Sequence, residues 1–349
     1  MGSGRQPHFT QARTGVIVEA HSRAISNLIS QNPSITELAE HADTNSYRTC
    51  GNTMKKKLTL EEGLSILNEG IAKAMMILDG FPTSALFTCE EYMKLYDCVY
   101  DMCVQLPPYE YCAELYAIFK KALEDGITSR VIPAVKDKSH IFLLCELWNM
   151  WSKYKIMAKC LGGFFLYLDR HFVEDRKAAS LSNLSISCFH DLVCVELYPK
   201  LLEAAICLIN EDRDDNPVCR DLLKNVSTFF VEIGRGNLHY YEKFEAEVVS
   251  STINYYKFVV PQWLRHYSSA DYVLKAEHSL SQEKERASQF LHQTSVEKLL
   301  RLVHELLLNQ TAKQLHEKQK SECGDGSVSY QEMLSQCAGL NLGEGSSRT

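Results

Sequence analysis

The 349-residue chain lacks the features of several large classes of protein. No uncharged apolar run approaches roughly 18 residues, the length at which a segment becomes a candidate transmembrane helix. Positive charge is not in excess either, because 44 acidic residues outnumber 37 lysines and arginines, for a net charge of −7. Proteins that bind duplex nucleic acid normally carry a basic stripe. We therefore expect no membrane partner and no nucleic-acid partner.

Motifs of catalysis and cofactor binding are missing as well. The sequence has no GxxxxGK[ST], GxGxxG, GxSxG or HExxH. The acidic loop at 212–216 begins like a calcium loop, but Pro217 replaces its required glycine and Leu223 its bidentate glutamate. Cys188 and Cys194, with a histidine between them, match no zinc spacing, and a helix would place them on different faces. The sequence thus predicts a protein that is not an enzyme and uses no cofactor or metal.

The cysteines do not have the pattern of a disulfide scaffold. There are 13 of them, an odd number, and none forms a CxxC pair. Most lie inside apolar segments, where a reduced thiol behaves as a small hydrophobic side chain. The N-terminus shows no apolar signal core. We therefore expect reduced thiols and a cytoplasmic or nuclear location.

Helical periodicity is what the sequence does contain, from Thr59 onward. Thr59 with Glu62, and Thr88 with Glu91, have the spacing of a capping box. Apolar residues then recur at intervals of three and four. The expected helices run over about 60–78, 89–105, 107–133, 138–154, 155–175, 185–210, 218–233, 239–265, 270–291 and 295–318. No segment alternates with a period of two, so we predict an all-α fold of repeated helical blocks.

Two of these helices carry tyrosines at helical spacing. Tyr92, Tyr96 and Tyr100 lie in the helix expected at 89–105. Tyr167 lies in the helix expected at 155–175, on one face with Gly163 and Arg170. Tyrosine and arginine are enriched in protein interfaces, which favours a recognition surface. The spacing also fits the alternative that these side chains only border the core.

Longer blocks of the sequence carry a resemblance to a known family. In order, they are EEYMKLYDCVYDMC, CFHDLVCVELYPKLLEAAICLI, LLKNVSTFFVEIGRG, YYEKFEAE, ADYVLKAEHSLSQEKERASQFLH and VEKLLRLVHELL. From about Leu58 to Cys323 the chain resembles a plant cullin, of the subclass that scaffolds SCF-type ubiquitin ligases.

The resemblance implies an elongated, solenoid-like arm of cullin repeats, each a bundle of α-helices. It implies a first, adaptor-binding repeat at 58–175, a second at 176–295 and the start of a truncated third at 296–323. We expect 1–57 to be a loose, disordered leader. The segment 324–349 resembles nothing in the family, and we expect it to be a disordered tail.

In cullins, the second and fifth helices of the first repeat bind the substrate-receptor side. Carried over residue by residue, the resemblance implies a groove for the BTB-like adaptor of F-box proteins, formed by Tyr92, Met93, Tyr96, Tyr167 and Arg170. The implied function is a non-catalytic scaffold arm of a cullin-RING ubiquitin ligase, acting in ubiquitin-dependent protein degradation.

The sequence also departs from the family. It has no counterpart of the C-terminal domain that holds the RING protein, so no RING partner is expected, and the chain could compete with full-length cullins for adaptors. Alternatives stay open: direct binding of a BTB receptor or a β-propeller adaptor, a decayed copy that binds no adaptor, or an unrelated helical interaction module.

Three local features of the predicted helices concern burial and stability. We expect Tyr100 to lie in the core. The Gly162–Gly163 pair is unusual for a helix, since each glycine costs about 1 kcal/mol relative to alanine. The segment 299–308 carries more apolar side chains than one helix face can bury, so we expect an exposed patch there that causes association.

Overall fold

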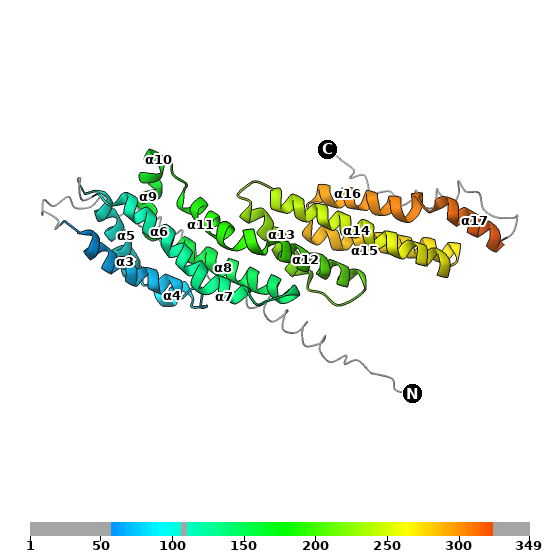
Figure 1. The fold of residues 1–349 in the computed structure, drawn as a ribbon, viewed down its shortest axis with the longest axis horizontal. Coiled ribbons are helices and arrows are strands. Elements are labelled where there is room, and N and C mark those ends of the chain that lie inside the picture. The colour runs from blue at the N-terminus through cyan, green and yellow to red at the C-terminus, as the bar shows by residue number, and fades with distance from the viewer. Residues whose placement is uncertain (1–56, 106–109, 324–349) are drawn as a thin grey trace, which may run out of the picture. The chain divides into compact units, whose positions relative to one another are not determined.

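The computed structural model describes residues 57–105 and 110–323, and every regular element in them is helical (Figure 1). The prediction of an all-α fold is confirmed. These residues form two compact units. The first unit contains the residues up to Leu222 and Phe229–Asn237, and the second contains Leu223–Thr228 and the residues from Leu238 onward. The predicted repeat boundaries stay predictions. Apart from Lys57, the predicted leader and tail lie outside the described residues.

The first unit is built around its longest helix, α8. Its elements are α3 (Leu60–Met75), α4 (Thr83–Leu86), α5 (Cys89–Cys103), α6 (Cys112–Gly126), η1 (Ile127–Val131), α7 (Ile132–Val135), α8 (His140–Phe164), α9 (Leu166–Arg170), α10 (Phe172–Arg176), α11 (Leu181–Phe189), η2 (His190–Cys194) and α12 (Val195–Arg213). The η elements are π-helical turns. Helix α8 packs against α3, α5, α6, α11 and α12 and is apolar on most sides, as expected of a central helix.

Two helix boundaries in this unit differ from the prediction. Separate helices at 138–154 and 155–175 were expected, but α8 runs unbroken to Phe164 and ends directly after Gly162 and Gly163. The expectation of a break at 154 is wrong because no glycine or proline interrupts the backbone there. The next helix was expected to begin at about 185, but α11 begins at Leu181, where Ser180 caps it by accepting a hydrogen bond from the Asn183 N–H at 3.2 Å.

The core of the first unit contains a group of aromatic rings in mutual contact. The Trp151 ring lies edge-to-face against Phe189 at 4.7 Å and against Phe229 at 5.4 Å. The Tyr154 hydroxyl donates to the Ser185 carbonyl oxygen at 2.8 Å, so this buried polar group is satisfied. Helix α13 (Arg220–Ile233) supplies Phe229 and spans the division between the two units.

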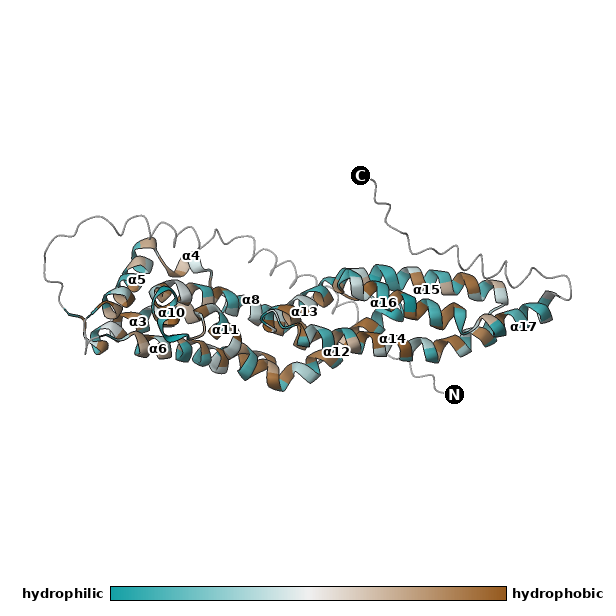
Figure 2. Cartoon of the chain, turned by 90° about the horizontal axis from the view of Figure 1, so that it is seen from above, coloured by the Kyte–Doolittle hydropathy of each residue, from teal (hydrophilic) through white to brown (hydrophobic). Residues whose placement is uncertain are grey.

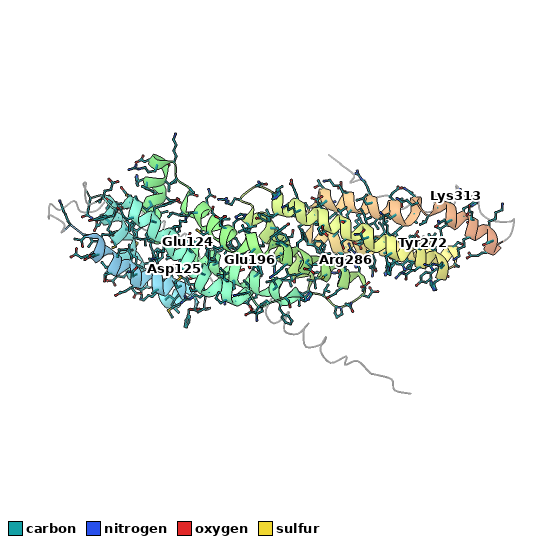
Figure 3. All side chains as sticks on the ribbon, in the orientation of Figure 1. Glu124, Asp125, Glu196, Tyr272, Arg286 and Lys313 are labelled. Atoms are coloured by element: carbon teal, nitrogen blue, oxygen red, sulfur yellow. The ribbon has the colours of Figure 1, made fainter. Side chains whose placement is uncertain are left out.

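The second unit has three long helices lying side by side (Figure 1). Its elements are α14 (His239–His266), α15 (Ser269–Phe290), α16 (Gln293–His304), η3 (Glu305–Asn309) and α17 (Ala312–Cys323). Helix α15 brings two buried charges into the core: Arg286 Nη1 lies 3.0 Å from Glu283 Oε1, which also accepts from the Tyr256 hydroxyl at 3.2 Å (Figure 3 labels Arg286). Because these groups pair within the core, neither charge is buried alone.

The apolar segment 299–308 is buried rather than exposed. Six of its seven apolar residues are less than a tenth exposed, and only Leu302, at 38%, faces solvent. The expected exposed patch is therefore wrong. Helix α16 packs against both α14 and α15, and the wide π-turn η3 lets three consecutive leucines at 306–308 point inward. Figure 2 shows the hydrophilic and hydrophobic residues mixed along α16, as on a helix with one face in a core.

Candidate protein-interaction surface

Helix α5 carries the tyrosine row, and hydrogen bonds fix where this helix begins. The Thr88 hydroxyl accepts from the Glu91 N–H at 3.2 Å, and the Glu91 carboxylate accepts from the Thr88 N–H at 2.9 Å. Glu91 also accepts from Lys73 Nζ on α3 at 2.6 Å, and this bond, followed by the one from Thr88, lowers the pKa of Glu91 to about 2. The predicted capping box is confirmed, and it joins the first turn of α5 to α3.

Tyr92, the first tyrosine of the row, points into the core. Its side chain is 6% exposed, and its hydroxyl donates to the Cys160 carbonyl oxygen on α8 at 3.2 Å. The ring meets Phe164 edge-to-face at 4.9 Å. Burial raises the pKa of the Tyr92 hydroxyl well above its usual value. The contacts give Tyr92 the role of holding α5 against α8, and its assignment to a binding groove stays a prediction.

Gly163 makes this position of Tyr92 possible. A β-carbon at Gly163 would overlap the Tyr92 hydroxyl oxygen. The neighbouring Gly162 is different, because a β-carbon there would meet no atom within 4 Å. Only one glycine of the pair is therefore required for the packing of α5 on α8.

The other two tyrosines of the row form a partly exposed group with Tyr167. We call Tyr96, Tyr100 and Tyr167 the tyrosine cluster. The Tyr100 ring lies edge-to-face against the Tyr167 ring at 5.0 Å, and the centroid of the His171 ring lies 4.3 Å from that of Tyr167. Burial, followed by the nearby Tyr100, raises the pKa of Tyr167, and Tyr96 adds to this effect. Helices α5 and α9 thus bring together aromatic side chains about 70 residues apart in sequence.

Met93 and Arg170, the remaining predicted site residues, lie one helical turn from this cluster. Met93 is half-buried and lies three residues before Tyr96 on α5. Arg170 is exposed and lies three residues after Tyr167 on α9. The structure therefore brings Tyr96 and Tyr167 together, keeps Met93 and Arg170 one turn away on the same two helices, and buries Tyr92.

Tyr100 was expected in the core, but it is 37% exposed, and that expectation is wrong. The reason is the helical repeat: residues four apart are offset by about 40°, so the row turns around the helix as it advances. Tyr92 points inward, Tyr96 is half-buried and Tyr100 reaches the surface. The i,i+4 spacing of the row contained this rotation, and it indicates that the three tyrosines do not all face the core.

A groove of about 580 Å³ lies on another side of α8. Its lining includes Trp151, Lys155, Gly162, Asp169 and Glu232. Its polar groups already have structural partners. Trp151 Nε1 donates to Glu232 at 2.6 Å and Lys155 Nζ lies 2.7 Å from the same carboxylate, while Asp169 accepts from the Leu181 N–H at 2.8 Å. These groups brace α8 against its neighbours and form no convergent catalytic arrangement.

Within residues 57–105 and 110–323, no group of three or more histidine, cysteine, aspartate or glutamate side chains could hold a metal ion. No helix among these residues is both long and apolar enough to cross a membrane. We interpret the tyrosine cluster as the candidate interaction surface because two helices bring its rings together there.

Comparison with known proteins places the chain among the cullins. The sequence profile of the Cullin alpha solenoid domain matches residues 67–340, more than half of the chain. The chain is 42% identical to Cullin-1 of Oryza sativa subsp. japonica over 270 residues, which cover 77% of this chain and 36% of the rice protein.

Two shorter relatives come from Arabidopsis thaliana. Putative cullin-like protein 2 is 36% identical over 269 residues, covering 76% of this chain and 71% of the relative. Cullin-like protein 3 is 28% identical over 253 residues, covering 72% of this chain and 97% of the relative. The chain spans about a third of the length of the rice cullin but most of the length of these two proteins. The profile match and the identity to these relatives show that the chain belongs to the cullin family.

Proposed function

We propose that this chain is a non-catalytic scaffold arm of an SCF-type cullin-RING ubiquitin ligase, and that its tyrosine cluster binds the BTB-like adaptor that carries F-box proteins. The single observation that carries the proposal is the cluster itself. Two helices far apart in sequence, α5 and α9, present Tyr100 and Tyr167 in ring contact beside the half-buried Tyr96. Family membership supports the scaffold role.

The chemistry of the cluster suits a protein partner. A tyrosine offers a rigid ring and a polar tip, and it loses little conformational entropy when a partner covers it. The edge-to-face contact between Tyr100 and Tyr167 holds both rings in place before a partner arrives. Preorganised aromatic groups of this kind lower the entropic cost of association.

The border of the cluster adds a second element of recognition. Met93 supplies a flexible apolar side chain, and Arg170 supplies a cation at the exposed end of α9. An apolar centre beside a polar margin is the usual organisation of a protein interface. Tyr92 acts below this surface as a positioning residue, because its bond to Cys160 fixes α5 on α8.

The test is capture of a purified adaptor–F-box complex by the full chain. We expect Tyr96→Ala to weaken binding by at least about tenfold, the usual loss when an interface hot spot is truncated. Tyr255→Ala is the matched control, since Tyr255 is also a half-buried helical tyrosine but lies on α14 in the second unit. Circular dichroism would establish that both variants remain folded.

The outcomes separate the proposal from its alternatives. An equal loss of adaptor binding in Tyr96→Ala and Tyr255→Ala would contradict a specific role for the cluster. A folded wild-type chain that captures no adaptor would overturn the adaptor-binding function and favour a decayed copy. Capture of a BTB receptor or a β-propeller adaptor instead would reassign the partner while keeping the surface.

A further inference from the structure

Two thiols lie next to the tyrosine cluster, at the junction of α5 and α6. Cys103 is the last residue of α5 and Cys112 the first of α6, and they are 6% and 8% exposed. The Tyr111 N–H donates to the Met102 carbonyl oxygen at 3.2 Å, which holds the two helix ends together. The Cys112 thiol lies 3.9 Å from the Cys103 carbonyl oxygen, as its hydrogen-bond donor. The Cys112 thiol thus points at the end of α5 that carries Cys103.

The two thiols differ in their surroundings. Cys112 begins a 15-residue helix, and the positive end of a helix dipole stabilises a thiolate. A hydrogen bond from Cys103 lowers the pKa of Cys112, while the same bond raises the pKa of Cys103. The carboxylates of Glu110 and Glu114 oppose the lowering at Cys112. The helix end and the lowered pKa favour the thiolate at Cys112 over one at Cys103.

The pair is close to the surface that binds the adaptor in our proposal. Cys103 and Cys112 both contribute to the raised pKa of Tyr167, so both sulfurs lie within electrostatic range of its hydroxyl. Tyr100 lies one helical turn before Cys103 on α5. A movement of this last turn would therefore reach the contact between Tyr100 and Tyr167.

We propose that Cys103 and Cys112 form a reversible disulfide that weakens adaptor binding at the tyrosine cluster, an inference that rests on the proposed function. The oxidant is hydrogen peroxide. The Cys112 thiolate attacks one peroxide oxygen, the O–O bond breaks, and Cys112 sulfenic acid and water form after proton transfer. Cys103 sulfur then attacks the sulfenic sulfur, releasing a second water and forming the disulfide. A dithiol reductant restores both thiols by exchange.

Geometry explains why the bond would weaken binding. A disulfide requires β-carbons about 3.8 Å apart and the two sulfurs bonded to each other. In the reduced structure the Cys112 thiol is directed instead toward the Cys103 carbonyl oxygen. Bond formation therefore pulls the last turn of α5 toward α6 and displaces Tyr100 from Tyr167. Thiols that are reduced at rest and oxidised transiently are consistent with a reducing compartment.

The experiment treats the full chain with hydrogen peroxide or with dithiothreitol, maps disulfides by mass spectrometry and measures binding of the adaptor–F-box complex. We expect a Cys103–Cys112 disulfide and at least about fivefold weaker binding, the low end of typical allosteric coupling. Cys112→Ser should abolish both effects. Cys98→Ser is the matched control, because Cys98 is also a buried thiol on α5, and it should retain both effects.

A second variant assigns the roles of the two thiols. In Cys103→Ser, dimedone should label the sulfenic acid that persists at Cys112. Absence of the disulfide in the oxidised wild-type chain would overturn the inference, as would a mapped disulfide that leaves adaptor binding unchanged. A reduced chain that captures no adaptor would overturn the proposed function and the regulation together, even where the disulfide forms.

Discussion

Tyr92 occupies the space that a side chain at Gly163 would need. The tyrosine hydroxyl reaches the Cys160 carbonyl oxygen, three residues before this glycine, at 3.2 Å. Because Gly163 has no side chain, the Tyr92 hydroxyl can reach the backbone of α8, and α5 packs closely against α8 at this point. The tyrosine cluster begins one turn farther along α5, so this contact positions the candidate binding surface.

The glycine pair offers a matched comparison. Gly163→Ala should destabilise the chain by about 1–3 kcal/mol, because its β-carbon would force Tyr92 out of place. Gly162→Ala should stabilise it by about 0.5–1 kcal/mol, because alanine is the better helix former and its β-carbon meets nothing. Urea unfolding followed by circular dichroism would measure both free energies. Equal effects of the two variants would contradict the assigned packing.

Two substitutions at Tyr92 separate a core role from a direct binding role. Tyr92→Phe removes only the hydrogen bond to Cys160 and should cost about 0.5–1.5 kcal/mol of stability. Tyr92→Ala also leaves a cavity and should cost about 3–5 kcal/mol. Adaptor binding should survive the phenylalanine substitution. Strong loss of binding in a Tyr92→Phe chain of near-normal stability would instead make the hydroxyl a direct contact of the partner.

The start of α5 should be sensitive to acid. The bonds from Lys73 and then from the Thr88 N–H lower the pKa of Glu91 from 4.5 to about 2, so the ionised carboxylate favours the folded chain. A group with a lowered pKa in the folded state stabilises above its unfolded pKa, and this contribution disappears as the pH falls toward the folded value. The difference in melting temperature between wild type and Glu91→Gln should therefore shrink between about pH 5 and pH 2. A pH-independent difference would count against the Lys73 bond.

Capping boxes and helical periodicity in the sequence predicted where helices form, but they predicted less well which side chains are buried. The capping boxes at Thr59 and Thr88 were confirmed because a cap depends on residues only three apart. The tyrosine row was recognised as one stripe, but its 40° drift per step, about one-ninth of a turn, decides which ring is buried. Only the position of α8 reveals that Tyr92 lies inside and Tyr100 outside.

Other features depended on partners that are distant in sequence. The requirement for Gly163 arises from a tyrosine 71 positions earlier, and no local rule identifies that pairing. The leucines at 306–308 exceed what one face of an α-helix can bury, but the π-turn η3 and two neighbouring helices accommodate them. Sequence periodicity assumes a constant helical repeat, and it fails where the repeat changes.

The division of α13 between the two units has a practical consequence for recombinant fragments. Phe229 packs on Trp151, and Phe230 packs on Tyr198. Glu232 accepts a hydrogen bond from the Trp151 indole. The first unit therefore contains residues that follow Leu223–Thr228, which belong to the second unit. An expression fragment that stops at residue 222 would lack these side chains and leave a hole in its own hydrophobic interior. No single cut in the polypeptide yields both halves intact, and a truncation meant to isolate the tyrosine cluster should extend to Asn237.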